Sequence, residues 1–310
     1  MISKDAIRAA ARRIAPHIRR TPVMEIAGPA LGLGHAVTLK LELFQHTGNF
    51  KARGAFNTLL SREIPAAGVV AASGGNHGAA VAYAGAELGI RARIFVPEIA
   101  GPSKIGLIER AGADLTVVPG AYANAAEAAA AYQAETGALS VHAYDAPETV
   151  AGQGTVALEM DEQAPGLDVV LVAVGGGGLL GGVAAAYSGS GTAVVAVEPE
   201  TAPTLHAALR DGPDTDVDVS GIAANSLGAR RIGRTGYDIA RAEGIETVLV
   251  SNDAIAEAQK RLWQGVRVLA EPGGAAALAA LTSGLYTPAD GARVGVIVCG
   301  ANLDPSPVGA

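Results

Sequence analysis

The sequence predicts an α/β protein in which mostly parallel strands are covered by helices on both faces. Short runs rich in Val and Ile alternate with Ala-rich stretches of helical period along the 310 residues, the order that β-α units produce. Several runs carry apolar residues at consecutive positions, as strands do when both faces of a parallel sheet are buried. Apolar residues make up 49% of the chain and aromatic residues only 4%, so we expect a core of Ala, Val, Leu and Ile.

Six strands are predicted along the chain, with helices between them. The strands comprise residues 68–72, 92–96, 115–118, 169–174, 193–197 and 294–298. The helices comprise residues 76–88, 121–135, 149–162, 179–186 and 253–269. Gly89 and Gly137 follow two of these helices, where a glycine often ends a helix in the left-handed conformation. The polar stretch 211–220 is predicted to be a surface loop.

The length of the chain favours two domains over one small module, because a core of this size usually divides. Residues 67–146 contain a self-sufficient series of strand and helix units. We therefore predict a small domain at 67–146, and a large cofactor-binding domain formed by residues 1–66 and 147–310.

Charge and composition narrow the class of partner. Lys and Arg number 23 against 30 Asp and Glu, a net charge of -7, which offers no basic field for nucleic acid or anionic lipid. The single cysteine excludes an internal disulfide framework, and the charged amphipathic start does not resemble a signal peptide. No apolar run reaches the roughly 18 residues that span a bilayer. We expect a cytoplasmic protein that acts on small molecules, with no nucleic-acid or membrane partner.

Lys51 follows an aromatic residue, Phe50, just before an amphipathic segment. An isolated lysine in such a place is usually exposed at the start of a helix. The functional alternative is an amine kept away from water so that it forms an imine with an aldehyde. Taken alone, the motif favours the exposed lysine.

A second motif, Ser73-Gly74-Gly75-Asn76-His77-Gly78, follows a predicted strand and begins a predicted helix. Its backbone N–H groups could bind an anion such as a carboxylate. Asn76 and His77 would add side-chain hydrogen bonds there. Alternatively, the run is only a helix cap with a glycine-rich turn.

Four consecutive glycines, Gly175 to Gly178, lie between a predicted strand and a predicted helix. Such a loop lets the backbone wrap around an anion at a helix N-terminus, and a phosphate group is the natural ligand. A rival interpretation is dinucleotide binding, because Gly176, Gly178 and Gly181 have the required spacing and Glu198 ends the next strand. The loop by itself is equally compatible with both.

Cys299 directly follows the predicted strand 294–298. A lone cysteine is usually a small core residue. However, the carboxyl ends of strands are where α/β sheets present ligands, so Cys299 is also a candidate site residue.

In this order, the four motifs resemble the fold-type II pyridoxal-phosphate family, most closely its serine/threonine dehydratase branch. The resemblance covers nearly the whole chain and includes two further segments, Ala151 to Thr155 and Glu271 to Ala276. It implies a two-domain fold like that of tryptophan synthase β, with open, mostly parallel sheets flanked by helices. The cofactor would be pyridoxal 5'-phosphate in the cleft between the domains, and a homodimer is expected.

The resemblance also implies site roles. Lys51 would hold the cofactor as a Schiff base and act as the catalytic base at the substrate α-carbon. Residues implied to bind the cofactor are Phe50, Lys51, Asn76, Gly175, Gly176, Gly177, Gly178, Leu179 and Cys299. Residues implied to bind the substrate are Ser73, Gly74, Gly75, Asn76 and His77. A monovalent or divalent cation would bind weakly at Glu198 and Ala202 through oxygen ligands, because Thr204 stands where a stronger ligand is often found.

The implied activity is β-elimination from L-threonine or L-serine, giving a 2-oxo acid and ammonia. Cys299 would face the pyridine nitrogen, and a thiol cannot hold a proton there as a carboxylate would, which favours elimination over transamination. Racemases of the family carry a serine where this chain has Gly74, so little racemisation is expected. The alternatives are hydroxyaspartate dehydratase, serine racemase, a β-replacement enzyme of the cysteine synthase type, an NAD-binding oxidoreductase and a cofactor-free binding protein.

Overall fold

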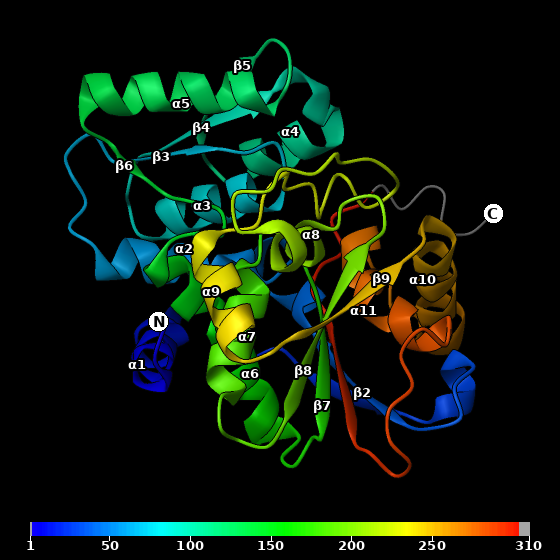
Figure 1. Ribbon diagram of the computed structural model, residues 1–310. Helices are drawn as coiled ribbons and strands as arrows, with labels where there is room; N and C mark the ends of the chain where they lie inside the picture. The colour runs from blue at the N-terminus through cyan, green and yellow to red at the C-terminus, as the bar shows by residue number, and fades with distance from the viewer. Residues whose placement is uncertain (1, 304–310) are drawn as a thin grey trace.

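The computed structural model describes residues 2–303, in which the strands form two sheets (Figure 1). The larger sheet is parallel except for its first strand, and its order is β1 (Val23–Ile26), β2 (Val37–Leu41), β10 (Val294–Val298), β7 (Val169–Ala173), β8 (Ala193–Pro199) and β9 (Glu246–Val250). The smaller sheet is parallel throughout, in the order β5 (Asp114–Val118), β4 (Ala92–Pro97), β3 (Val69–Ala72) and β6 (Leu139–Ser140). The predicted fold class is confirmed.

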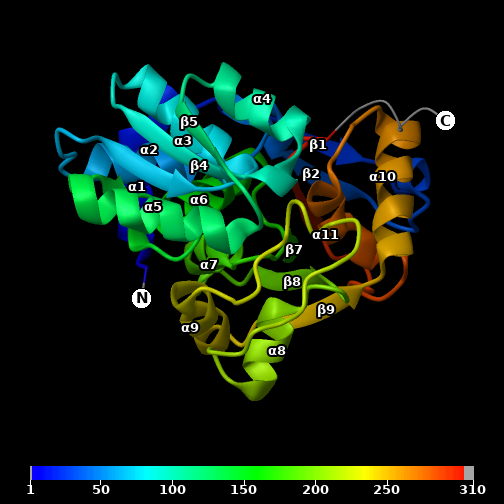
Figure 2. The same ribbon diagram turned by 90° about the horizontal axis from the view of Figure 1, so that it is seen from above.

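Helices cover both faces of the larger sheet, as its apolar strands require. On one face, α11 (Pro272–Thr282) packs on the strands and is itself covered by α10 (Asn252–Val266). On the other, α7 (Gly178–Tyr187) packs on β7 and β8 and is followed outward by α6 (Pro147–Gln163) (Figure 2). The outer helices on this side are α1 (Lys4–Ile14) and α9 (Arg234–Ala242), and α8 (Thr204–Asp211) follows β8.

The smaller sheet lies between two helical layers of its own. On one face, α5 (Tyr122–Thr136) contacts all four strands. On the other, α3 (Asn76–Glu87) packs between α2 (Lys51–Ser61) and α4 (Pro102–Arg110). Each sheet has a separate buried apolar core. Within residues 2–303, no helix combines the length and apolarity that crossing a membrane requires.

All six predicted strands are present, and β10 has the predicted bounds. Four strands were not predicted, namely β1, β2, β6 and β9. The expected burial on both faces is wrong for β5, because this strand lies at the edge of the smaller sheet and two of its five residues are exposed. The irregular stretch after α8 agrees with the predicted loop. Division into domains at residues 67 and 146 stays a prediction, although every strand of the smaller sheet lies within it.

The start of α7 is held in place by close packing against α6. A Cβ atom added to Gly182 would lie 2.5 Å from the carbonyl oxygen of Val150, and one added to Gly154 would lie 2.8 Å from the carbonyl oxygen of Gly182. Because real Cβ atoms essentially never approach other atoms this closely, only glycine permits this spacing of the two helices. The contact fixes the position of the glycine loop that precedes α7.

Candidate active site

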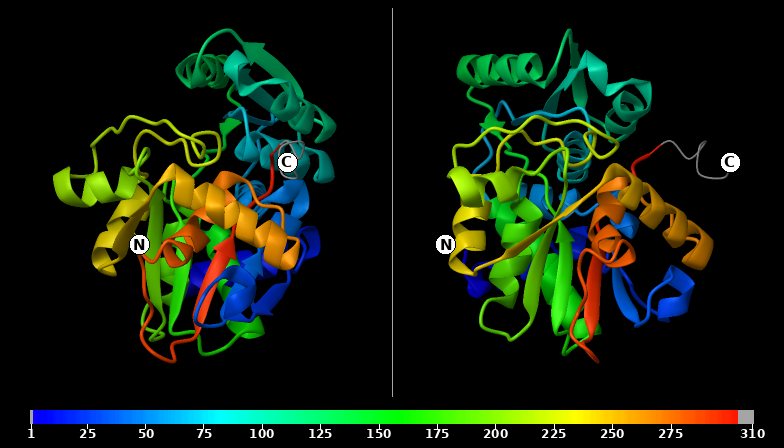
Figure 3. Two further views of the ribbon diagram at one scale, coloured as in Figure 1. Left: turned by 90° about the vertical axis from the view of Figure 1, so that its right-hand side faces the viewer. Right: turned by 45° about the vertical axis from the view of Figure 1, so that its right-hand side comes forward.

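The four predicted motifs meet at one pocket between the two sheets. The larger sheet runs with its carboxyl ends toward the smaller one (Figure 3), so the turns after β7 and β10 face the turn after β3. The pocket is lined by Phe50, Lys51, Asn76, Tyr144, Ala173, Gly175, Gly176, Gly177, Gly178, Leu179, Leu180, Ser226, Leu227, Glu271 and Cys299. Ser73, Gly74, Gly75 and His77 lie on the turn next to Asn76 without lining the pocket.

Lys51 is the first residue of α2, and its amine lies inside the protein. The Nζ atom donates a hydrogen bond to the carbonyl oxygen of Ala143 at 2.6 Å and lies 5.2 Å from the ring centroid of Phe50. Burial lowers the pKa of Lys51 to about 8, while the nearby thiol of Cys299 acts in the opposite direction. About a tenth of the amine is therefore neutral and nucleophilic at pH 7, far more than for an ordinary lysine. This geometry favours the desolvated amine over the exposed lysine.

The glycine loop ends in a helix start with unused hydrogen-bond donors. No side chain caps α7, and within residues 2–303 the N–H groups of Gly177, Gly178 and Leu179 donate to no protein acceptor. Gly177 has a φ of +84°, which a residue with a side chain rarely adopts. Free N–H groups at a helix N-terminus are a site for an anion. The structure thus agrees with the predicted phosphate loop.

Packing gives these glycines a second reason to lack side chains. A Cβ atom on Gly178 would lie 2.9 Å from Cα of Tyr144, and one on Gly175 would lie 3.0 Å from Cα of Leu227. A Cβ atom on Gly176 would overlap the ring of Tyr144. The backbones of residues 144 and 227 therefore form the walls that approach the loop most closely.

The turn after β3 offers a second uncapped helix start. The N–H group of Gly75 donates to Ser73 Oγ at 3.2 Å, but no side chain caps α3. In the described part of the chain, the N–H groups of Asn76 and His77 have no acceptor. The His77 Nε2 atom lies 2.8 Å from the carbonyl oxygen of Val141, and burial lowers the pKa of His77 to about 3. His77 is thus neutral and donates to that carbonyl, leaving its backbone N–H for an anion.

Both polar atoms of the Asn76 side chain make a hydrogen bond to a residue next to α11 or β10. Its Nδ2 atom donates to Glu271 Oε1 at 2.7 Å, and its Oδ1 atom accepts from Asn302 Nδ2 at 2.8 Å. Glu271 precedes α11 and Asn302 follows β10. These two hydrogen bonds join the smaller sheet to the larger one beside the pocket.

Cys299 lies at the end of β10, where the sequence predicts a ligand. Its side chain is buried, and Sγ donates to the carbonyl oxygen of Gly273 at 3.3 Å. Burial, with the nearby carboxyl of Glu271, raises the pKa of Cys299 far above its ordinary value. The residue is therefore a neutral thiol.

Three polar residues that line the pocket have no role in the sequence analysis. Tyr144 follows a short edge strand, and Ser226 lies in an irregular segment with no recognisable pattern. The sequence analysis includes Glu271 in the segment Glu271 to Ala276 but gives it no role of its own. Its position directly before Pro272, the first residue of a helix, could have indicated a site residue, because ligands in α/β proteins often bind where helices begin.

Comparison with known proteins identifies the family. Residues 14–300 match the family described as "Pyridoxal-phosphate dependent enzyme". The chain belongs to this family. A phenylserine dehydratase from Ralstonia pickettii is 36% identical over 97% of this chain and 93% of its own. An L-threonine ammonia-lyase from Thermotoga maritima is 35% identical over 98% of this chain and 76% of its own. The solved structure of maize serine racemase is 33% identical with a TM-score of 0.91, covering 99% and 95% of the two chains.

The residues of this pyridoxal-phosphate enzyme fit the cofactor. Lys51 would provide a buried amine for the aldehyde, and the uncapped N-terminus of α7 would provide donors for the phosphate. The neutral thiol of Cys299 and the amide of Asn76 line the same pocket. Nothing further is needed at α7 to accommodate an anion, since its donors have no competing acceptor in the described residues.

Glu198 of the pyridoxal-phosphate enzyme is buried beneath the glycine loop and caps α8. Its carboxylate accepts from the backbone N–H groups of Leu205 and His206, both at 2.8 Å, and Thr204 Oγ1 lies 3.0 Å away. Thr204 Oγ1 also donates to the carbonyl oxygen of Gly175 at 2.6 Å. No group of three or more His, Cys, Asp or Glu residues suited to a metal occurs in the described residues. The predicted cation at Glu198 and Ala202 stays a prediction.

The titration of Glu198 gives a testable pH dependence. Burial raises its pKa from 4.5 to about 7, so between these values the folded chain holds a proton that the unfolded chain has released. The contribution of Glu198 to the free energy of unfolding should therefore fall as the pH rises from about 5 to 8. The free energy of unfolding at pH 8 minus that at pH 5 should be more positive in Glu198→Gln than in wild type by roughly 1–3 kcal/mol. Urea unfolding of wild type and variant at both pH values measures the difference.

The control for this measurement is Glu200→Gln, because Glu200 is exposed two residues further along. Its pH dependence should equal that of the wild type. Equal pH dependence in wild type and Glu198→Gln would contradict the buried titration of Glu198.

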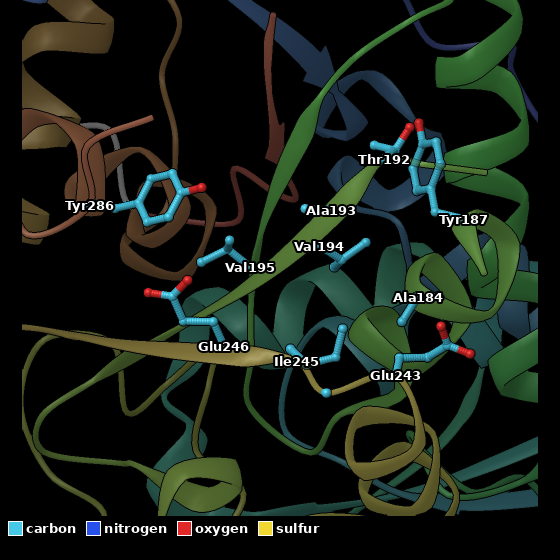
Figure 4. A pocket seen from close by; sticks show the side chains of 11 residues that line it. Ala184, Tyr187, Thr192, Ala193, Val194, Val195, Glu243, Ile245, Glu246 and Tyr286 are labelled. Atoms are coloured by element: carbon cyan, nitrogen blue, oxygen red, sulfur yellow. The ribbon is translucent and has the colours of Figure 1, made fainter. Parts of the chain in front are cut away.

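A second hollow of this pyridoxal-phosphate enzyme opens at the opposite edge of the larger sheet, where β8 and β9 begin (Figure 4). Its lining includes Tyr187, Glu243, Glu246 and Tyr286. The described residues that line it include no lysine, cysteine or histidine, so none of the predicted motifs reaches it. Residues from all four predicted motifs line the pocket at Lys51 instead.

Proposed function

We propose that the chain is an ammonia-lyase that converts L-threonine or L-serine to the corresponding 2-oxo acid and ammonia. The proposal depends mainly on one observation, the desolvated amine of Lys51. This amine shares a pocket with the neutral thiol of Cys299 and the uncapped start of α7, and the uncapped start of α3 lies beside the pocket. One helix start suits the cofactor phosphate and the other suits the substrate carboxylate. The phenylserine dehydratase and L-threonine ammonia-lyase among the relatives support this reaction class.

In the proposed reaction, the N–H groups at the start of α3 hold the substrate carboxylate. Bound pyridoxal phosphate supplies an aldehyde that captures the substrate amine and a ring that withdraws electrons from the α-carbon. Lys51, neutral in part because its pKa is about 8, removes the α-proton as a general base. The β-hydroxyl then leaves as water, and its proton is balanced by the α-proton that Lys51 removed. Hydrolysis of the resulting imine consumes one water and releases ammonia, so that the net loss is ammonia.

Cys299 sets the electronic character of the site in this proposal. A buried thiol with a raised pKa donates to a backbone carbonyl and carries no charge. It cannot stabilise a protonated pyridine as a carboxylate would. A neutral ring supports a carbanion poorly, so prompt loss of the hydroxyl is favoured over transamination.

The experiment that tests the proposal is spectroscopic and chemical. Purified protein should absorb in the visible range, and borohydride should fix a pyridoxyl group on the peptide that contains Lys51. Incubation with L-threonine, L-serine, 3-phenylserine and 3-hydroxyaspartate should release ammonia and a 2-oxo acid, fastest with one of the first two. A colourless protein without an adduct, or an adduct without ammonia release from any substrate, would overturn the proposal. A much higher rate with phenylserine or hydroxyaspartate would reassign the substrate.

Gly74 predicts that the enzyme racemises serine poorly. The residue carries no group that could donate a proton, and a Cβ atom there would lie 2.5 Å from Cβ of Ala100. A serine at this position, which the family resemblance implies for racemases, would not fit without movement of the turn after β4. Chiral chromatography of L-serine incubated with the protein should show ammonia release exceeding D-serine formation by at least about tenfold. Comparable rates of the two would contradict the role assigned to Gly74.

A further inference from the structure

We propose that Glu271 is a positioning residue that orients the Asn76 amide, across the junction of the two sheets, so that an N–H group points at the cofactor. The inference rests on the proposed role of Asn76 in cofactor binding. It does not depend on which amino acid is the substrate. Glu271 itself acts through Asn76 rather than on the reacting atoms.

The orientation of Asn76 follows from a chain of hydrogen bonds with a single possible direction. The carbonyl oxygen of Thr47 can only accept, and it takes a hydrogen bond from Asn302 Nδ2 at 2.7 Å. The same Nδ2 atom donates to Asn76 Oδ1 at 2.8 Å, so this oxygen is occupied as an acceptor. At the other end, the ionised carboxylate of Glu271 can only accept, and it takes one N–H of Asn76.

The second N–H of Asn76 is the one left for a ligand. Turning the amide over would place its NH₂ group against Asn302 Nδ2 and its oxygen against a carboxylate, and both contacts are repulsive. The pocket lined by Asn76 therefore receives a donor and not an acceptor. A donor is what an anionic ring oxygen of the cofactor requires.

The ionisation of Glu271 controls the strength of this arrangement. The residue is 4% exposed, and burial raises its pKa to about 7, against the opposing effects of the Asn76 hydrogen bond and the charge of Lys104. Cys299 also faces this carboxyl, and Lys51 lies in the same pocket. Below about pH 7 the carboxyl takes up a proton, and the charged hydrogen bond that holds Asn76 is lost. The orienting effect should therefore act above this pH.

Two substitutions separate the charge of Glu271 from its hydrogen-bond acceptor. Glu271→Gln keeps an acceptor oxygen but removes the charge, and Glu271→Leu removes both. The apo form of each variant should be titrated with pyridoxal phosphate by absorbance between about pH 6 and 9. At pH 8.5, Glu271→Leu should raise the Kd of the cofactor about tenfold, as for loss of one hydrogen bond to a charged group. For Glu271→Gln, the ratio of Kd to that of wild type should approach one below about pH 6.

A double-mutant cycle distinguishes positioning from a general structural effect. If Glu271 acts through Asn76, then Glu271→Leu should add less than about twofold to the Kd of Asn76→Ala. Additive effects, or an unchanged Kd in Glu271→Leu at pH 8.5, would overturn the proposal. Should Glu271→Leu fail to fold, the test becomes the ratio of the Kd of Glu271→Gln to that of wild type. A ratio that does not change with pH would contradict the proposal. Glu246→Gln, an exposed carboxylate at the start of β9, is the control and should bind like wild type.

Failure of this proposal and of the proposed function can be told apart. A wild-type protein that binds pyridoxal phosphate on Lys51 but releases no ammonia would end the lyase proposal and leave the binding cycle fully interpretable. Normal lyase activity with additive Kd effects would end only the role of Glu271. A wild type that binds no cofactor would overturn both.

Discussion

Replacing Lys51 by arginine is expected to lower turnover by roughly 10⁴-fold, the upper range for loss of a general base. Arginine keeps the positive charge and much of the length of lysine. However, its pKa lies above the range in which it could lose a proton, whereas burial lowers the pKa of Lys51 to about 8. The variant has neither a neutral base nor an amine that forms an imine. Ammonia release under saturating substrate and cofactor measures the loss.

The matched control for Lys51→Arg is Lys260→Arg, an exposed lysine on α10, which should retain wild-type turnover. A second arm uses Lys51→Ala, which leaves space for a small amine. Added methylamine should restore part of the activity of Lys51→Ala, because a free amine can replace the missing base. Lys51→Arg should gain nothing from methylamine. Turnover of Lys51→Arg above about one hundredth of wild type would show that another group performs the proton transfer.

β7 and β10 could be predicted from the sequence because no charged residue interrupts their apolar runs. β10 and β7 consist almost entirely of Val, Ile and Leu, and both are fully buried. β2 was missed because Lys40 interrupts it, although this lysine is fully buried and pairs with Glu159 at 2.8 Å. A charge in a central strand becomes acceptable only when a distant helix supplies its partner. That partner lies 119 positions away in the chain, beyond the reach of local patterns.

The same distinction applies to the site. The glycine loop and Cys299 could be predicted because each follows a recognisable strand, and parallel strands bring their carboxyl ends to one edge. Lys51 could be predicted as a site residue only when its motif was considered together with those two. Tyr144 and Glu271 were missed as site residues because their positions depend on how the two sheets face each other. The contact between Glu271 and Asn76 spans 195 positions, and neither residue is distinctive in its own segment.

Removing the guanidinium of Arg53 is expected to destabilise the fold by about 3–5 kcal/mol, the usual cost of breaking a buried ion pair. Arg53 is fully buried on α2 and contacts Glu42 and Glu159, each at 2.8 Å. These carboxylates hold its pKa above the ordinary value despite burial. In Arg53→Met, Glu42 would remain buried without its ion-pair partner. The free energy of unfolding in urea at pH 7.5 measures the effect.

The matched control is Arg62→Met, at the end of the same helix. Its ion pair with Glu148 is partly exposed, with 49% and 24% of the two side chains accessible to solvent, so the loss should stay below about 1 kcal/mol. If the stranded charge causes the instability of Arg53→Met, adding Glu42→Gln should recover part of it, because a neutral amide costs less to bury than a carboxylate. A double variant no more stable than Arg53→Met would assign the loss to packing instead. Because Arg53 lies two residues beyond Lys51, the single variant should also bind pyridoxal phosphate more weakly, and the double variant should recover binding together with stability.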